Sequence, residues 1–350
     1  MLYSMNDPFL RLRIVRIDIE TADARSYWLE ATNGQPVSYR PGQFLTLVLR
    51  HNDHEVRRSY SISSPLGQGL RLTIKRISNG EVSRWLLDTL RVGDELTSLP
   101  PAGRFTLDAA APGDLLLLGA GSGITPLLPL LSQALAGRTN GRITLLYSNT
   151  HERSVLFWGE LERLQQQNPD RFRLIHLLSN PSDDWTGRRG RLNNVMLEQL
   201  LPSLTDGTDR RALTCYVCGP PAYMRMAQFT LVVAGVPAEQ IRRENFVVEP
   251  VMIVPQPAQA IDRSVTLQLP DRQVSIQVPA YKTILQAALD EGLHLPYSCR
   301  GGRCATCAAR LVSGRVGMTI NDVLTTRDLA EGWILTCTGY PESDGVVIAL

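Results

Sequence analysis

Four of the six cysteines lie near the C-terminal end of this 350-residue chain and have the spacing of an iron–sulfur site. They form a C-x4-C-x2-C run and one distant partner: Cys299, Cys304, Cys307 and Cys337. Four thiolates can hold two tetrahedral irons, and this spacing is typical of a 2Fe-2S cluster. The Gly301-Gly302 pair lets the loop wrap the cluster closely, because glycine has no side chain and tolerates positive φ. We therefore expect these four cysteines to be the metal ligands.

Two other roles for these cysteines stay open: a zinc site and reduced structural thiols. Zinc ligands usually come as two C-x-x-C pairs. Here only Cys304 and Cys307 form such a pair, and the first cysteine stands five residues earlier. The alternative of another class is therefore a non-catalytic protein that binds zinc for structure.

The last segment of the chain, residues 263–350, resembles a plant-type ferredoxin domain. The resemblance rests on three runs: Pro296–Cys307, Glu331–Cys337 and Tyr340-Pro341. It implies a β-grasp fold. Soluble plant-type ferredoxins are strongly acidic, whereas residues 262–350 carry eight basic and nine acidic side chains. A carrier tethered to its reductase needs less electrostatic steering, because the linker supplies a high effective concentration.

A second group of candidate residues lies in the first third of the chain. Arg58-Ser59-Tyr60-Ser61 follows an apolar strand and a polar turn, and Gly80-Glu81-Val82-Ser83 follows later. This order resembles the ferredoxin–NADP reductase superfamily, as do the segments Pro41–Phe44 and Pro101–Phe105. The resemblance implies FAD as the cofactor, and FMN is the alternative because some reductases with this domain order use it.

The same resemblance implies a role for each residue of the flavin site. Arg58 would neutralise the flavin phosphate, Tyr60 would pack against the isoalloxazine ring, and the Ser61 hydroxyl would bond near flavin N5. Gly80, Val82 and Ser83 form a turn that opens a short helix, and free N–H groups at a helix start suit a pyrophosphate.

A glycine-rich turn indicates a nucleotide site in the middle of the chain. The run Gly119–Pro126 follows the apolar strand Leu115–Leu118 and opens a helix, which is the context that such a turn requires. Glycines let a pyrophosphate approach the backbone, and we expect Gly121, Gly123 and Thr125 to contact it. The G-x-G-x-x-P form resembles that of the reductase superfamily.

The run Cys215–Pro221 contains the C-G-P signature of the same superfamily. The resemblance places Cys218, with Gly219 and Pro220, beside the nicotinamide C4 atom from which the hydride leaves. Ser61 and Cys218 are therefore the expected catalytic residues. Cys215 points to the opposite face of a strand, so we expect it to be a buried thiol.

The choice between NADH and NADPH depends on the loop after the third strand of the nucleotide domain. NADPH-using relatives often have a Ser-Arg pair there, whereas this chain has Ser179-Asn180, which favours NADH. Arg188, Arg189 and Arg191 follow and are the alternative partners of a 2′-phosphate. The run Glu244-Asn245-Phe246 resembles the E-x-F segment of the superfamily, which implies that Phe246 lies at the flavin.

Three domains are needed to position these residues, and the length and the ordinary composition of the chain allow them. Residues 1–107 have alternating strands and one short helix at 81–90, which predicts an antiparallel β-barrel for flavin. Residues 108–249 alternate buried strands with helices, which predicts an α/β domain with a parallel sheet for the nucleotide. A proline-rich linker at 250–262 leads to the ferredoxin-like domain.

Composition and charge exclude several classes of protein. The net charge of +2 supplies no field for nucleic acid or an anionic membrane. The uncharged stretch 115–137 is long enough to span a bilayer, but its glycines and prolines would break a spanning helix. Residues 1–20 are too charged for a signal peptide, and we expect a cytoplasmic protein with reduced thiols.

Together these resemblances imply an NAD(P)H-dependent flavin and iron–sulfur reductase. Electrons would pass from nicotinamide to flavin, then to the cluster, and finally to a separate protein. The domain order resembles reductase components of bacterial oxygenases, such as those of phenylacetyl-CoA epoxidase and phthalate dioxygenase, and hybrid-cluster-protein reductase. The acceptor is therefore expected to be an oxygenase, a desaturase or a hybrid-cluster protein. A diaphorase that reduces small oxidants directly is the alternative enzyme.

Overall fold

The computed structural model describes residues 9–65, 67–77, 80–107, 113–137, 141–205, 207–246 and 261–350. The chain divides into two compact units, Met1–Glu244 and Asn245–Leu350. Almost all of the expected linker lies outside the described residues, as do residues 108–112 after the expected end of the barrel domain. The exact domain boundaries therefore stay predictions.

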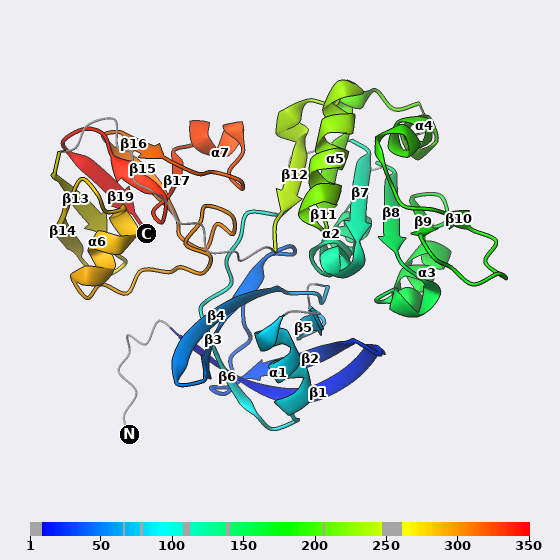
Figure 1. Cartoon of the computed structure of the whole chain (residues 1–350), viewed down its shortest axis with the longest axis horizontal. Helices are drawn as coiled ribbons and strands as arrows, with labels where there is room; N and C mark the ends of the chain where they lie inside the picture. Colours follow the sequence, from blue (N-terminus) through cyan, green and yellow to red (C-terminus); the bar gives the residue numbers. More distant parts are fainter. Residues whose placement is uncertain are drawn as a thin grey trace. The chain divides into compact units, whose positions relative to one another are not determined.

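The first unit begins with an antiparallel sheet in the order β4-β3-β6-β1-β2-β5. Its strands are β1 (Leu10–Thr21), β2 (Ala24–Ala31), β3 (Phe44–His51), β4 (His54–Ser61), β5 (Leu70–Lys75) and β6 (Glu95–Ser98). A bridge between Ile62 and Leu72 links the end of β4 to β5, the strand at the other edge of the sheet. The sheet thus closes into the predicted barrel (Figure 1).

The core of the barrel follows the alternation of apolar residues in its strands. Leu12 and Ile14 of β1 and Leu45 and Leu47 of β3 are fully buried in one hydrophobic cluster. The predicted short helix is α1 (Glu81–Thr89), which buries Val82, Leu86 and Leu87 against the same cluster. Strands of period two and a helix of period 3.6 therefore share this core.

The second part of the first unit is a parallel sheet in the order β10-β9-β8-β7-β11-β12, flanked by helices (Figure 1). Its strands are β7 (Leu115–Ala120), β8 (Ile143–Asn149), β9 (Phe172–Leu178), β10 (Arg188–Arg189), β11 (Thr214–Cys218) and β12 (Ile241–Glu244). Its helices are α2 (Ile124–Ala136), α3 (Trp158–Gln167), α4 (Asn194–Thr205) and α5 (Pro221–Val233). The predicted βαβα order is confirmed.

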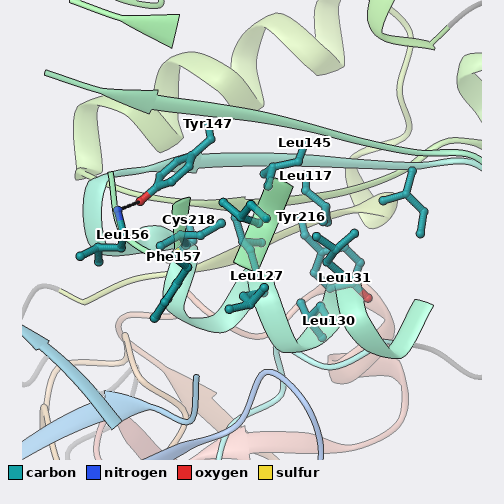
Figure 2. Packing of buried hydrophobic residues seen from close by; sticks show 14 of the residues in the cluster. Leu117, Leu127, Leu130, Leu131, Leu145, Tyr147, Leu156, Phe157, Tyr216 and Cys218 are labelled. Atoms are coloured by element: carbon teal, nitrogen blue, oxygen red, sulfur yellow. Dashed lines mark hydrogen bonds between the residues drawn. The ribbon is translucent and has the colours of Figure 1, made fainter. Parts of the chain in front are cut away.

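Each face of this sheet buries its own cluster. Leu117, Tyr147 and Cys218 pack with α2 and α3 on one face, and Figure 2 shows part of this cluster. On the other face Leu116 and Cys215 pack with α4 and α5. Strand alternation thus separates the two cysteines of β11 as predicted, and Cys215 is a buried thiol.

Local backbone geometry sets the ends of two elements. The strand β11 begins only at Thr214, because Arg210–Ala212 form a turn of 3-10 helix. The helix α3 begins at Trp158, since Phe157 has φ 58° and cannot belong to a right-handed helix. The uncharged stretch 115–137 forms β7, a short 3-10 turn and α2. No helix in the described ranges is long and apolar enough to cross a membrane.

The second unit has a mixed sheet in the order β14-β13-β19-β15-β17. Its larger elements are β13 (Arg263–Gln268), β14 (Gln273–Val278), α6 (Ile284–Asp290), β15 (Ala308–Ser313), β17 (Trp333–Leu335) and β19 (Val346–Ala349). Thr283 is the N-cap of α6 and accepts a bond from the Gln286 N–H group at 3.2 Å. The helix buries Ile284 and Leu285 in the core of this unit. A second ladder joins β16 (Val316–Met318) to β18 (Gly339–Pro341), while α7 covers Thr326–Ala330. This arrangement is the expected β-grasp fold.

Candidate functional site

Two sequence segments that resemble the reductase superfamily pack against each other in the barrel. A Cβ atom on Gly42 would lie 1.9 Å from the Phe105 carbonyl oxygen, and one on Gly103 would lie 2.9 Å from the Phe44 ring. Phe44 and Ala102 exchange backbone hydrogen bonds of 2.9 and 3.0 Å. Both glycines are therefore required by close approach of the two segments.

The end of β4 carries the first group of predicted flavin residues. Arg58 and Tyr60 share one face of the strand, where Tyr60 packs against the barrel core. Ser61 lies on the other face and is 4% exposed. Burial raises the pKa of the Tyr60 hydroxyl, so this side chain stays neutral. A flat aromatic ring and a buried hydroxyl thus lie at adjacent positions of the strand end.

The turn at Gly80–Ser83 has the geometry of a backbone anion site. Gly80 is the N-cap of α1 and supplies no side-chain cap, so the first N–H groups of the helix rely on other acceptors. A Cβ atom on Gly80 would lie 2.7 Å from the Ser83 hydroxyl. That hydroxyl donates to the Gly80 carbonyl and accepts from the Ile77 N–H group, both at 3.1 Å. Because Val82 and Ser83 are buried, a pyrophosphate would meet their backbone rather than their side chains.

The glycine turn after β7 contacts the C-G-P segment directly. A Cβ atom on Gly123 would lie 2.1 Å from the Cys218 carbonyl oxygen, and one on Gly219 would lie 2.8 Å from the Ala120 side chain. The Thr125 hydroxyl donates to the Ser122 carbonyl at 2.9 Å, so it stabilises the turn itself. Residues that are about a hundred positions apart in the sequence thus pack backbone against backbone, which leaves no room for a side chain at Gly123.

Cys218 and Ser61 both bond to Glu244, the last residue of β12. The Ser61 hydroxyl donates to the Glu244 carboxyl group at 3.1 Å, and the Cys218 thiol donates to the Glu244 carbonyl oxygen at 3.4 Å. Burial raises the pKa of the Glu244 carboxyl to about 8, although the bond from Ser61 opposes this shift. Burial raises the pKa of the Cys218 thiol as well. The two predicted catalytic residues therefore meet beside a carboxyl group that holds its proton at neutral pH.

Glu244 is the candidate site residue that sequence reasoning missed. It was visible only as the first residue of the E-x-F segment, in which Phe246 was the expected flavin contact. The structure gives Phe246 a side chain that is 38% exposed, so its contact with flavin stays a prediction. An isolated glutamate gives no sign of burial, and only the pairing of β11 with β12 places Glu244 opposite Cys218.

The loop after β9 is fixed by its own hydrogen bonds. One Arg189 amino group donates to the carbonyl oxygens of Ser182, Asp183 and Trp185 at 2.8–2.9 Å. The Ser182 hydroxyl donates to the Glu152 carboxylate at 2.6 Å. Arg189, one of the candidate partners for a 2′-phosphate, is thus used to hold the loop.

The cysteine loop aims backbone donors at sulfur, as expected. The N–H groups of Gly301 and Arg303 both donate to the Cys299 sulfur at 3.4 Å, and the Thr306 hydroxyl lies 3.2 Å from the Cys304 sulfur. A Cβ atom on Gly302 (φ 73°) would lie 2.5 Å from the Ile320 carbonyl oxygen. The loop therefore wraps tightly at Gly302.

The expectation that the Gly301-Gly302 pair supplies the positive φ values of the cysteine loop is only half right. Gly302 has a positive φ, but Gly301 does not; Arg300 and Ala305 take φ values of 50° and 56° instead. Arg300 stacks on the Tyr297 ring at 4.2 Å, and Arg303 pairs with Asp322 at 3.3 Å. These contacts over-determine a strained loop conformation, which is common where a backbone wraps a ligand.

The four late thiols interact with one another. Hydrogen bonds from Cys304 and Cys337 lower the pKa of Cys299, and a bond from Cys337 lowers that of Cys307. The same bonds raise the pKa of Cys304 and Cys337. In the part of the chain that the structure describes, no group of three Cys, His, Asp or Glu side chains is arranged to hold a single metal ion. The donor set of four cysteine sulfurs, three from one loop and the fourth from Cys337, is of the kind that holds a 2Fe-2S cluster.

Family models match the chain in three consecutive segments. An oxidoreductase FAD-binding domain matches residues 11–107, and an oxidoreductase NAD-binding domain matches residues 117–229. A 2Fe-2S iron-sulfur cluster binding domain matches residues 268–342. The chain therefore carries FAD-binding, NAD-binding and 2Fe-2S domains in this order, and the predicted cofactors FAD, a nicotinamide dinucleotide and a 2Fe-2S cluster each have their domain.

Known proteins of the same length resemble the whole chain. It is 36% identical to the ferredoxin reductase component of 3-ketosteroid-9-alpha-monooxygenase from Mycobacterium tuberculosis, over 98% of this chain and 96% of the relative. It is 32% identical to a component of the 1,2-phenylacetyl-CoA epoxidase from Escherichia coli K12, over 97% of both chains. The structure of phthalate dioxygenase reductase, at 24% identity, has the same fold with a TM-score of 0.59 over 98% of both chains. The chain therefore belongs to the family of oxygenase reductase components, oxidoreductases that join an FAD-binding, an NAD-binding and a 2Fe-2S domain.

Proposed function

We propose that this chain carries electrons from NADH through FAD and a 2Fe-2S cluster to a separate oxygenase. The observation that carries the proposal is the meeting of Ser61, Cys218 and Glu244 inside the first unit. It joins the end of a barrel strand, where flavin is expected, to the C-G-P segment, where nicotinamide is expected. When bound, the nicotinamide supplies a hydride, the flavin converts it to single electrons, and the cluster carries them one at a time.

The barrel residues bind and orient the flavin in this proposal. Arg58 supplies positive charge for the phosphate, Tyr60 supplies a ring face, and the N–H groups at Gly80, Val82 and Ser83 receive the pyrophosphate. The Ser61 hydroxyl donates a hydrogen bond to the Glu244 carboxyl group. Rotation of this hydroxyl can direct the same O–H group towards a flavin nitrogen. Phe246 is proposed as a second aromatic contact of the ring.

The nucleotide residues position the nicotinamide and exclude water. Gly121, Gly123 and Thr125 shape the pyrophosphate turn, while Gly219 and Pro220 direct the chain away after Cys218. Cys218 is fully buried and holds its proton, so it presents an uncharged, polarizable surface to the nicotinamide ring. Glu244 retains a second proton behind Ser61, which keeps negative charge away from the site of hydride arrival.

The cluster ligands are proposed to be Cys299, Cys304, Cys307 and Cys337. The N–H donors at Cys299 and the hydroxyl group at Cys304 would stabilise charge on the sulfurs. The proposed domain boundaries are residues 1–107, 108–249 and 263–350, with a linker at 250–262.

NADH is proposed as the electron donor rather than NADPH. A 2′-phosphate needs free arginines near the adenosine ribose. Arg189 is engaged with three carbonyl oxygens, and Asn180 stands at the position where NADPH-using relatives often have arginine. The Glu152 carboxylate, bonded to Ser182 in the same loop, adds negative charge that disfavours a phosphate.

The acceptor is proposed to be an oxygenase rather than a desaturase or a hybrid-cluster protein. The similar proteins are named as components of a 3-ketosteroid monooxygenase, a phenylacetyl-CoA epoxidase and a glycine betaine monooxygenase. We also propose a reducing compartment such as the cytoplasm, because none of the six cysteines forms a disulfide bond.

The conduit can be distinguished from a diaphorase by removing one cluster ligand. The holoprotein and its Cys304→Ser variant are compared in NADH-driven reduction of cytochrome c and of ferricyanide, with Cys215→Ala as a control for loss of a buried thiol. The proposal expects loss of the cytochrome c rate with a retained ferricyanide rate. An unchanged cytochrome c rate in Cys304→Ser would favour the diaphorase.

A further inference from the structure

Tyr147, on β8, lies at the centre of the apolar cluster under α2 and is completely buried. Its hydroxyl donates to the Gly121 carbonyl oxygen at 2.8 Å and accepts from the Leu156 N–H group at 3.4 Å. Figure 2 shows the second of these bonds, and Leu117, Leu127 and Leu145 belong to the same buried cluster. A hydroxyl buried among leucines is costly unless it is bonded, and this one is bonded twice.

The Gly121 carbonyl belongs to the peptide group that enters the glycine turn. Gly121 has φ 55°, and its carbonyl oxygen also accepts from the Ile124 N–H group. In a trans peptide the carbonyl and the following N–H point in opposite directions. Because Tyr147 holds the carbonyl towards the core, the Ser122 N–H points away from the core.

Thr125 holds the next peptide group in the same way. Its hydroxyl donates to the Ser122 carbonyl, so the Gly123 N–H is directed away from that bond. Two consecutive N–H groups with fixed directions at a helix start form an anion-binding nest. The turn is thus pre-formed by two side chains that need not touch the anion.

We propose that Tyr147 is a positioning residue of the dinucleotide site, whose hydroxyl fixes the Gly121–Ser122 peptide group so that its N–H faces the pyrophosphate. The inference rests on the proposed function, since it takes this turn as the pyrophosphate site. The inference extends the proposed function, because it assigns a role to a residue that the dinucleotide does not contact. Tyr147 also ties the turn to Leu156, just before α3, so that the turn and the start of that helix are held by one hydroxyl.

The test compares Tyr147→Phe with a matched control, Tyr216→Phe. Tyr216 lies in the same cluster, is 1% exposed, and donates its hydroxyl to the Thr106 carbonyl at 2.9 Å. Each variant therefore removes one buried hydroxyl and its bond to a carbonyl oxygen, and Tyr147→Phe also removes the bond from the Leu156 N–H group. Steady-state kinetics with NADH, inhibition by ADP-ribose and by AMP, and thermal unfolding are measured on the flavin-loaded full chain.

Tyr147→Phe is expected to raise the KM for NADH and the inhibition constant of ADP-ribose about tenfold, with kcat changed less than about twofold. AMP, which lacks the pyrophosphate, should be affected less. Tyr216→Phe should lower the unfolding temperature by a similar amount and leave both constants unchanged. A wild-type KM in Tyr147→Phe, or an equal rise in Tyr216→Phe, would overturn the assignment.

A second variant covers the case in which Tyr147→Phe folds poorly. Thr125→Val removes the bond to the Ser122 carbonyl and should raise the same two constants, because it releases the neighbouring peptide group. Unchanged constants in this variant contradict the nest. If the wild-type chain oxidises no NADH, the proposed function fails; if it does so and Tyr147→Phe matches it, only the inference about Tyr147 fails.

Discussion

Two groups of cysteine thiols in this chain have opposite surroundings. At the end of β11 burial raises the pKa of Cys218, and the nearby Glu244 carboxyl raises it further. In the cysteine loop, the backbone N–H groups of Gly301 and Arg303 both donate to the Cys299 sulfur at 3.4 Å. The Cys218 sulfur thus lies in an apolar wall beside Glu244, whereas the sulfurs of the cysteine loop lie against backbone N–H groups and a threonine hydroxyl.

The difference shows how the chain divides its chemistry. A neutral thiol in an apolar wall offers shape and polarizability to a ring but does not ligate a metal, because the thiolate is the metal ligand. A thiol surrounded by donors is prepared for the thiolate state. The position of donors, rather than the presence of cysteine, therefore separates the hydride site from the cluster site.

The largest effect is expected from the cluster side. Cys304→Ser should abolish the visible absorption of the cluster and the reduction of cytochrome c, because one of the four thiolates is lost. Iron content and absorption spectra measure the first effect, and NADH-dependent assays measure the second. A Cys304→Ser variant that keeps its iron and its rate of cytochrome c reduction would show that Cys304 is not a cluster ligand.

The cysteine pair of β11 offers the sharpest internal contrast. Cys218→Ala should slow flavin reduction by NADH by about a hundredfold, because a misplaced nicotinamide ring loses its alignment for hydride transfer. Cys215→Ala, on the opposite face of the same strand, should leave that rate unchanged. Stopped-flow reduction measures both rates. Equal slowing in the two variants would show that the effect is structural.

The buried carboxyl beside Cys218 predicts a dependence on pH. The ordinary pKa of glutamate is 4.5, and burial raises that of Glu244 to about 8, so folding favours its protonated form. Its contribution to the free energy of unfolding is complete below pH 4.5 and is lost as the pH rises to about 8. Glu244→Gln, which cannot ionise, should lose less stability over this range than the wild type.

Urea unfolding at a series of pH values measures this difference. The variant Glu198→Gln, at an exposed position of α4, is the control and should follow the wild type. The pH profile of flavin reduction should lose an ionisation near pH 8 only in Glu244→Gln. Parallel stability curves for the wild type and Glu244→Gln would show that the carboxyl is not protonated in the folded chain.

The smallest effect concerns a single hydroxyl in the cysteine loop. Thr306 is buried, and its hydroxyl can donate to the Cys304 sulfur at 3.2 Å. Thr306→Val should lower the reduction potential of the cluster by about 20–60 mV, because a donor to a sulfur stabilises the reduced state. Redox titration measures the potential, with Thr319→Val as a control, since the Thr319 hydroxyl donates to the Thr338 carbonyl oxygen at 3.4 Å. If Thr306→Val leaves the reduction potential unchanged, the Thr306 hydroxyl does not contribute to the potential of the cluster.

Short segments of this chain were predictable because their geometry is local. The glycine turn, the cysteine spacing and the alternation that separates Cys215 from Cys218 each depend on a few consecutive residues. The parallel-sheet domain followed from the order of its apolar runs and helices, and the β-grasp domain from its resemblance to plant-type ferredoxins. The expectation that glycines supply the positive φ values of the cysteine loop was only partly right. Arg300 and Ala305 also take positive φ values, and Arg300 is held by its contact with the Tyr297 ring.

Contacts between distant residues were not predictable. Glu244 lies 183 positions from Ser61, and nothing in its immediate sequence indicates that it is buried. The Gly121 carbonyl meets Tyr147 only because β7 and β8 are neighbours in the sheet. In both cases the strand order brings together the residues that tune the site, whereas the motif residues are set by their own turns.

Anaerobic reduction of the holoprotein by NADH tests the whole account most directly. Stopped-flow absorption follows the flavin band and the cluster band separately after mixing. The account predicts that the flavin band bleaches first and that the cluster band then bleaches in the same molecules, without any added acceptor. Bleaching of flavin with the cluster left oxidised, or a protein with zinc in place of iron and no cluster band, would contradict it.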